Sequence, residues 1–210
     1  MAVLKTTNGG ITWPTRRFLG IEGEYGTICE AIAVAPSDPS IVYAGGQQNY
    51  YAYAAVWSSA DAGNSWVDIT EGLDLQLTRY DSVYAIWVSP LDPRMILAGT
   101  SEGVFKRAAT GRGRDCTWSP TAMQHSTNGF TYDPLTGIIY AATVNGVFET
   151  DDTGSSWREL NEGLGCLNTS CIGLDSDNGL LYVGTIGGSV WRLAVGVSGQ
   201  DGEGEMDPDE

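Results

Sequence analysis

The chain has 210 residues, of which 42% are apolar and 18% are charged, and its formal net charge is −15. This length and apolar content suit one globular domain, and the negative charge disfavours nucleic-acid partners, since phosphate neutralisation needs a basic surface. No apolar run is long enough for a transmembrane helix, so membrane insertion is not expected. The first residues contain no apolar signal-peptide core.

Residues 2–6 and 11–18 are predicted strands that flank an eight-residue motif at 6–13, and residues 19–28 form a loop. Similar octets occur at 59–66 and 150–157, with the form Ser/Thr-x-Asp/Asn-x-Gly-x-Ser/Thr-Trp, and residues 114–118 keep only the Thr-Trp end. The Asp or Asn side chain is expected to accept backbone N–H groups a few residues later, while Gly supplies a positive φ. We predict structural turns, each followed by an inward-facing Trp that opens a strand. The defining residues are Asn8, Gly10, Trp13, Ser59, Asp61, Gly63, Trp66, Asp152, Gly154 and Trp157.

Four strand-rich units follow the first octet, near residues 28–72, 83–120, 128–160 and 170–193. Each unit starts with a short apolar strand, turns at Pro and Asp or at Asn-Gly, and returns in a second strand. A third strand follows in every unit, and a fourth begins at or just before Trp66, Trp118 and Trp157. The units are therefore predicted to be four-stranded antiparallel meanders, except that the last has three strands.

The tryptophans of the octets recur at intervals of about 40–50 residues, which is typical of propeller blades. The octet resembles the Asp-box, or BNR repeat, of sialidases, xyloglucan-degrading glycoside hydrolases, sortilin-type receptors and photosystem II assembly factors. The resemblance covers residues 1–195 and implies an all-β fold, a β-propeller of four-stranded antiparallel blades. In this family the octet lies at an outer turn between the third and fourth strands, away from the ligand face.

The units predict about four blades, which is the lower limit for a closed ring. Residues 11–18 could supply the fourth strand that the last unit lacks, but residues 2–6 would then be redundant with 190–193. We therefore expect an open arc or incomplete ring, with self-association or with further blades from a longer parent chain. Residues 196–210 are acidic and rich in Gly, and we predict a disordered tail because they cannot bury enough apolar surface.

One face of a propeller collects the loops that enter each first strand and those that join the second strand to the third, and we expect a ligand there. The longest second-to-third-strand loop combines amides with aromatic rings, which suits sugar recognition because rings stack on C–H faces while amides pair with hydroxyls. The alternative is a loop that packs over its own blade. The predicted ligand-binding residues are Gln47, Gln48, Asn49, Tyr50, Tyr51 and Tyr53, with Arg79 and Tyr80 from the next blade.

Asp81 follows Arg79 and Tyr80 and is the candidate catalytic residue, as a general acid or base. The alternative is a surface ion pair between Arg79 and Asp81. Matching loops one blade earlier and one blade later carry Glu22, Glu24, Tyr25, Gln124 and His125.

No metal or cofactor is predicted, because the chain has one His and no Cys-x-x-Cys spacing. Cys166 and Cys171 bracket a loop and could form a disulfide in a secreted protein, although four cysteines allow three pairings. Cys29 and Cys116 are expected to be buried thiols. Residues 175–179 resemble the start of a calcium loop, but position twelve is Ile186, so we predict a hairpin turn.

Two functions fit these features. The first is a non-catalytic binding or scaffold propeller for carbohydrate or protein, within a larger extracellular or cell-surface protein. The alternative is a glycoside hydrolase resembling sialidases or xyloglucanases, which requires two carboxylates at the scissile bond. The sialidase Phe/Tyr-Arg-Ile-Pro motif is absent from the sequence. One partial ring would hold at most one acid of a xyloglucanase pair, and Asp81 is the best candidate.

Overall fold

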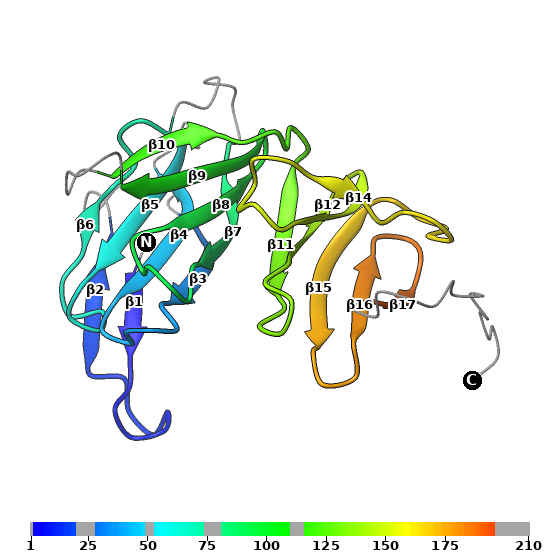
Figure 1. Cartoon of the computed structure of the whole chain (residues 1–210). Coiled ribbons are helices and arrows are strands. Elements are labelled where there is room, and N and C mark those ends of the chain that lie inside the picture. The colour runs from blue at the N-terminus through cyan, green and yellow to red at the C-terminus, as the bar shows by residue number, and fades with distance from the viewer. Residues whose placement is uncertain (1, 20–27, 49–52, 74–80, 110–115, 196–210) are drawn as a thin grey trace.

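A computed structural model describes residues 2–19, 28–48, 53–73, 81–109 and 116–195, and within these ranges all regular structure is β-strand (Figure 1). The strands form five antiparallel sheets, each from strands consecutive in the chain. A half-blade contains β1 (Ala2–Lys5) and β2 (Thr15–Phe18). Blade 1 contains β3 (Ile28–Val34), β4 (Val42–Gln48), β5 (Tyr53–Ser59) and β6 (Val67–Asp68).

Blades 2 to 4 repeat the same meander. Blade 2 contains β7 (Val83–Val88), β8 (Ile96–Thr100), β9 (Gly103–Ala109) and β10 (Cys116–Pro120). Blade 3 contains β11 (Thr127–Tyr132), β12 (Ile139–Thr143), β13 (Gly146–Thr150) and β14 (Arg158–Glu159). Blade 4 has three strands, β15 (Thr169–Asp175), β16 (Leu180–Thr185) and β17 (Val190–Ala194). The predicted all-β fold with four-stranded antiparallel sheets is confirmed.

The first strands of successive blades contact one another, β3 with β7, β7 with β11 and β11 with β15. They form the inner edge of an arc, and the remaining strands of each blade extend outward (Figure 1). The half-blade lies at one end of this arc and blade 4 at the other. Within the described ranges the two ends do not pair, because β1–β2 and β15–β16–β17 are separate sheets.

Apolar clusters between the blades hold the arc together. Tyr43 and Val56 of blade 1 pack against Val88 and Phe105 of blade 2. The next two clusters join blade 2 to blade 3 and blade 3 to blade 4. Burial of these apolar side chains is the main favourable term in folding, so each blade depends on its neighbour.

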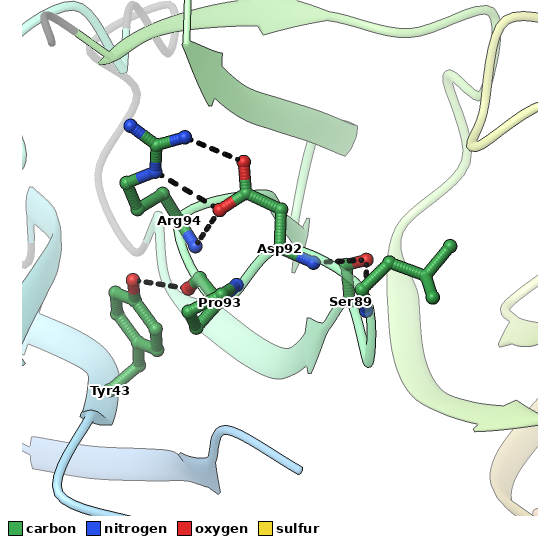
Figure 2. A network of polar contacts seen from close by, with 6 residues as sticks. Tyr43, Ser89, Asp92, Pro93 and Arg94 are labelled. Carbon is green, nitrogen blue, oxygen red and sulfur yellow. Dashed lines mark hydrogen bonds and ion pairs between the residues drawn. The ribbon is translucent and has the colours of Figure 1, made fainter. Parts of the chain in front are cut away.

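A polar contact also links blades 1 and 2 (Figure 2). The Tyr43 hydroxyl donates a hydrogen bond to the Pro93 carbonyl at 2.7 Å, across the blade interface. Pro93 lies in the turn between β7 and β8, where Arg94 donates to both Asp92 oxygens at 3.0 Å. This hydrogen bonding by Arg94 lowers the pKa of the Asp92 carboxyl. Asp92 therefore stays ionised, and its ion pair with Arg94 holds the turn closed.

The octets form the predicted turns between third and fourth strands. Ser65 N donates to Asp61 Oδ1 at 2.7 Å, the Ser59 hydroxyl donates to the same oxygen at 2.8 Å, and Gly63 has a φ of +84°. The octet at 150–157 repeats these contacts through Asp152, and Asn8 replaces the carboxylate in the first octet, accepting from Thr12 N at 3.0 Å. The self-satisfied turn is therefore confirmed for all three octets.

The inward-facing Trp is confirmed in part. Trp118 is buried, while Trp66 and Trp157 are half-buried and pack against apolar clusters. Trp13 is 53% exposed, so its predicted inward orientation is wrong. The other three tryptophans each lie against the blade before them, and no earlier blade is described for Trp13.

The cysteine predictions also need correction. None of the four cysteines forms a disulfide among the described residues, including Cys166 and Cys171, for which a pairing in a secreted protein was considered. Cys29 is exposed and Cys116 is half-buried, so neither is the buried thiol that was expected. Cys29 lies on β3, the inner strand of blade 1. Among the described residues only the two-stranded half-blade precedes blade 1, so β3 is not covered by a full blade on that side.

Candidate functional site

The predicted ligand face is built where each first strand begins and each second strand ends. In blade 2, Ser101 follows β8, and its backbone N–H donates to the Ser82 carbonyl at 3.3 Å. The corresponding bonds from Val144 to Ser126 and from Ile186 to Asn168 recur in blades 3 and 4. This repeated bond holds the loop before each first strand beside the loop after each second strand, as expected for a propeller.

Asp81 lies on this face two residues before β7 begins, and only 2% of its surface is exposed. The Ser101 hydroxyl donates to Asp81 Oδ1 at 3.1 Å. Burial of a carboxylate is costly without hydrogen bonds, so Ser101 is part of what keeps Asp81 in place. The candidate acid is thus beneath the surface of the predicted ligand face.

A second carboxylate approaches the same place from blade 1. The first strand of each blade contains a one-residue bulge near its start, and Glu30 is the bulge residue of β3. The Ser82 hydroxyl donates to the Glu30 carboxylate, which joins β3 to the start of β7. Bulges often direct a side chain toward a functional site, and here the bulge directs Glu30 toward the next blade.

Tyr84 is the bulge residue of β7 and lies close to both acids. Burial raises the pKa of the Tyr84 hydroxyl, and the negative charges of Glu30 and Asp81 raise that pKa further. The hydroxyl therefore remains protonated at neutral pH and is available as a hydrogen-bond donor. Glu30, Ser82, Tyr84, Asp81 and Ser101 together form what we call the rim site.

The described part of the predicted amide–aromatic loop adjoins the rim site through β3. Gln47 of β4 pairs with Ile28 of β3, and Gln48, the last residue of β4, pairs with Tyr53 of β5. Tyr53 is exposed, and the two glutamines are half-buried. The predicted residues Asn49, Tyr50, Tyr51, Arg79 and Tyr80, and also Glu22, Glu24 and Tyr25, lie outside the described residues.

His125 occupies the matching loop of blade 3. Its ring lies 5.6 Å from the Phe148 ring, and its Nδ1 lies 3.2 Å from Asn145 Nδ2. The ring is therefore packed on blade 3 and tied to the neighbouring loop. Gln124 beside it is exposed.

Four rim-site residues were not singled out in the sequence: Glu30, Ser82, Tyr84 and Ser101. A usable signal existed, because each apolar first strand carries one polar or aromatic residue at the same early position. These bulge residues are Glu30, Tyr84, Asn128 and Ser170. Asn128 also reaches the next blade, donating to the Thr169 carbonyl at 2.7 Å.

A shallow recess of about 340 Å³ lies on the outer side of blades 2 and 3, lined in part by Lys106, Thr117, Ser119 and Ser155. Among the described residues no cluster of His, Cys, Asp or Glu is arranged to hold a metal ion. The described ranges also contain no helix of a length and apolarity that would cross a membrane.

Neither a protein-family model nor a curated protein matches the chain. Solved structures do. The GH74 enzyme of Niastella koreensis is 20% identical with a TM-score of 0.56, over 79% of this chain and 28% of that one. Sqt1 of Chaetomium thermophilum, bound to the N-terminus of ribosomal protein L10, is 19% identical with a TM-score of 0.57, over 82% and 46%.

YCF48 of Cyanidioschyzon merolae is 12% identical with a TM-score of 0.50, over 82% of this chain and 58% of that one. The chain therefore spans less than two thirds of the length of each of these structures. At these identities the likeness establishes architecture. The chain is an all-β protein with the architecture of a β-propeller of about four blades.

Proposed function

We propose that the chain is a non-catalytic binding propeller whose ligand lies across the rim site and the adjoining Gln47, Gln48 and Tyr53. The observation that carries the proposal is the burial of Asp81 under a bond from Ser101. A general acid must come within hydrogen-bond reach of the atom it protonates. A carboxylate that is 2% exposed does not offer that reach to a polymer lying on the surface.

The chemistry of the site favours a neutral carbohydrate. Tyr53 offers an exposed ring, Gln48 beside it offers amide donors and acceptors, and the Tyr84 hydroxyl and Glu30 carboxylate offer one donor and one acceptor. A net charge of −15 disfavours acidic polysaccharides because like charges repel over several ångströms. Solved structures with this architecture include both a GH74 enzyme and a propeller bound to a protein segment. Glycans and peptides are therefore both suitable test ligands.

Titration calorimetry with neutral glucan and xyloglucan oligosaccharides tests this proposal. Tyr53→Ala and Gln48→Ala are each expected to weaken binding at least tenfold, which is about 1.4 kcal/mol. Leu135→Ala is the control, because Leu135 is exposed on a turn between β11 and β12, away from the rim. No binding by any oligosaccharide, or equal binding by all variants, would contradict the carbohydrate assignment.

A glycoside hydrolase is the second candidate, and one observation favours it. Two carboxylates, Glu30 and Asp81, lie close enough to Tyr84 to raise the pKa of its hydroxyl. Glycosidases use two carboxyl groups at one site. This candidate predicts that reducing ends are released from a glucan and that Asp81→Asn abolishes the release. Binding without release supports the first proposal instead.

A further inference from the structure

Octet tryptophans have a defined place in the packing of the arc. Trp118, in the fourth strand of blade 2, lies on blade 1, and its Nε1 donates to the Ile69 carbonyl at 2.7 Å. Its ring packs with Leu73 in the cluster between the two blades. Trp157 of blade 3 likewise packs in the cluster that contains Met123 of blade 2. A fourth strand thus completes its own blade and also covers the blade before it.

The surface that receives Trp118 is repeated in blade 3, where the described residues place no fourth-strand tryptophan on it and Trp191 of β17 lies at its edge. Residues 69–73 read Ile-Thr-Glu-Gly-Leu, and residues 160–164 read Leu-Asn-Glu-Gly-Leu. Both segments follow the fourth strand in the same way, since Ile69 N donates to Val56 O and Leu160 N donates to Val147 O, each at 2.9 Å. The second segment therefore offers the same kind of receiving surface as the first.

Over residues 160–164 the structure has a cavity of about 400 Å³ between blades 3 and 4. Leu160, Glu162 and Leu164 line it from blade 3, and Trp191 and Leu193 line it from β17. The place is that of a fourth strand of blade 4, which the described residues lack. Trp191 Nε1 is buried beside this cavity without an acceptor among the described residues, and a strand docked there would bring backbone carbonyls.

The N-terminal hairpin carries the complementary part. Trp13 ends its octet and is 53% exposed. Residues 2–18 contain Lys5, Arg16 and Arg17 and no acidic residue. A hairpin with three positive charges is attracted to a chain whose net charge is −15, and Glu162 lines the cavity.

The two ends of the arc also expose apolar residues that are buried between blades elsewhere in the arc. Tyr140 and Val147 of blade 3 are fully covered by blade 4, whereas the equivalent residues of blade 4, Tyr182 and Val190, are 40% and 72% exposed. At the other end Ile32 of β3 is 63% exposed, whereas its equivalent Ile86 packs against blade 1. The exposed face of blade 4 thus carries the residues that bind a following blade, and β3 carries those that bind a preceding one.

We propose that two copies of the chain associate head to tail, with Trp13 of each copy in the cavity between blades 3 and 4 of the other. Strand β2 then pairs with β17 of the partner copy as its fourth strand, and blade 4 stacks against β3. In this arrangement β17 of one copy replaces β1 of the other copy beside β2. The replacement fits because Val3 of β1 packs on blade 1 at the position equivalent to Val190 of β17.

A second copy, and not the same chain, is the fitting occupant. Strands β2 and β17 lie at opposite ends of the arc (Figure 1), and three buried clusters fix the blades between them. Two arcs that exchange β2 in this way have four complete blades each. The resulting ring of about eight blades lies within the usual range for propellers, and its two-fold symmetry forms each contact twice.

Sedimentation equilibrium over a range of concentrations tests the proposal. The wild type is expected to reach twice the monomer mass, and Trp13→Ala is expected to weaken the association at least tenfold. Ile11→Ala is the matched control, because Ile11 is 83% exposed in the same octet and the fold of the hairpin does not need its side chain. A wild type that stays monomeric, or a Trp13→Ala variant that associates like the wild type, would overturn the proposal.

Complementation gives a second test. Leu164→Asp blocks the cavity but keeps Trp13, while Trp13→Ala keeps the cavity. Each variant alone is expected to be monomeric, and an equimolar mixture is expected to form a heterodimer with one intact contact. A mixture that remains monomeric, with both variants folded by circular dichroism, would count against the cavity as the docking place. If Leu164→Asp does not fold, the comparison of Trp13→Ala with Ile11→Ala decides alone.

Discussion

At the residue scale, the carboxylates of the octets are tuned by the turns they close. Hydrogen bonds from Ser65 lower the pKa of Asp61 to about 2, and bonds from Ser156 lower the pKa of Asp152 to about 2. Both side chains are exposed, so the shift comes from hydrogen bonds and not from burial. Carboxylates that accept several hydrogen bonds commonly behave in this way.

This tuning predicts an acid dependence of stability. A carboxyl whose folded pKa lies below its unfolded value stabilises the fold above the unfolded value, near pH 4, and loses that contribution as the pH falls through about 2. The double variant Asp61→Asn/Asp152→Asn should therefore lose less thermal stability than the wild type between pH 5 and pH 2. Scanning calorimetry at several pH values measures the melting temperature of both proteins. Identical slopes for both proteins would contradict the prediction.

The first octet indicates that these variants keep their turns. Asn8 already holds its octet with a neutral amide, accepting from Thr12 N and donating to the Thr12 hydroxyl at 2.8 Å. Asp152→Ala has no such replacement and should lower the melting temperature at neutral pH more than Asp152→Asn does. Thermal unfolding of the pair measures the difference, and equal melting temperatures would show that these hydrogen bonds do not stabilise the turn.

At the scale of strands and blades, close approach of neighbouring first and second strands holds the arc together. A Cβ added at Gly99 of β8 would lie 2.8 Å from the Thr127 carbonyl oxygen of blade 3. A Cβ at Gly173 of β15 would meet nothing within 4 Å. Gly99→Ala should therefore destabilise the protein by about 1–3 kcal/mol through overpacking, whereas Gly173→Ala should change stability little. Urea unfolding distinguishes them, and equal effects would contradict this account of blade packing.

The bond between blades 1 and 2 gives another prediction at this scale. Tyr43→Phe removes the donor to the Pro93 carbonyl (Figure 2) and should cost about 1 kcal/mol. Tyr182→Phe is the matched control, because Tyr182 occupies the equivalent position in blade 4 and is partly exposed. Chemical unfolding of both variants measures the cost. A loss for Tyr182→Phe as large as that for Tyr43→Phe would contradict the role of this contact.

The strands and octet turns could be predicted from the sequence because their determinants are local. The Asp–Gly spacing of an octet and the alternation of apolar strands with Pro/Asp turns act within a few residues. The exposure of Trp13 and the burial of Asp81 depend on which blade lies beside them. Such contacts join residues some 50 positions apart, as between Glu30 and Ser82, and no local pattern encodes them.

At the scale of the whole molecule, the proposed ligand site and the proposed association surface lie on different parts of the arc. The rim site lies at the junction of blades 1 and 2, and the cavity lined by Leu160 and Leu164 lies between blades 3 and 4. The two sites use different residues. A variant of Trp13 should therefore alter association while leaving the affinity of the isolated chain for its ligand unchanged.

The most direct measurement incubates the purified chain with neutral xyloglucan and mixed-linkage glucan and records both retention on the polysaccharide and release of reducing ends. We predict retention without release, with retention lost in Tyr53→Ala and unchanged in Leu135→Ala. Release of reducing ends that disappears in Asp81→Asn would contradict a non-catalytic propeller and would identify a hydrolase. Absence of both retention and release would contradict the carbohydrate as ligand.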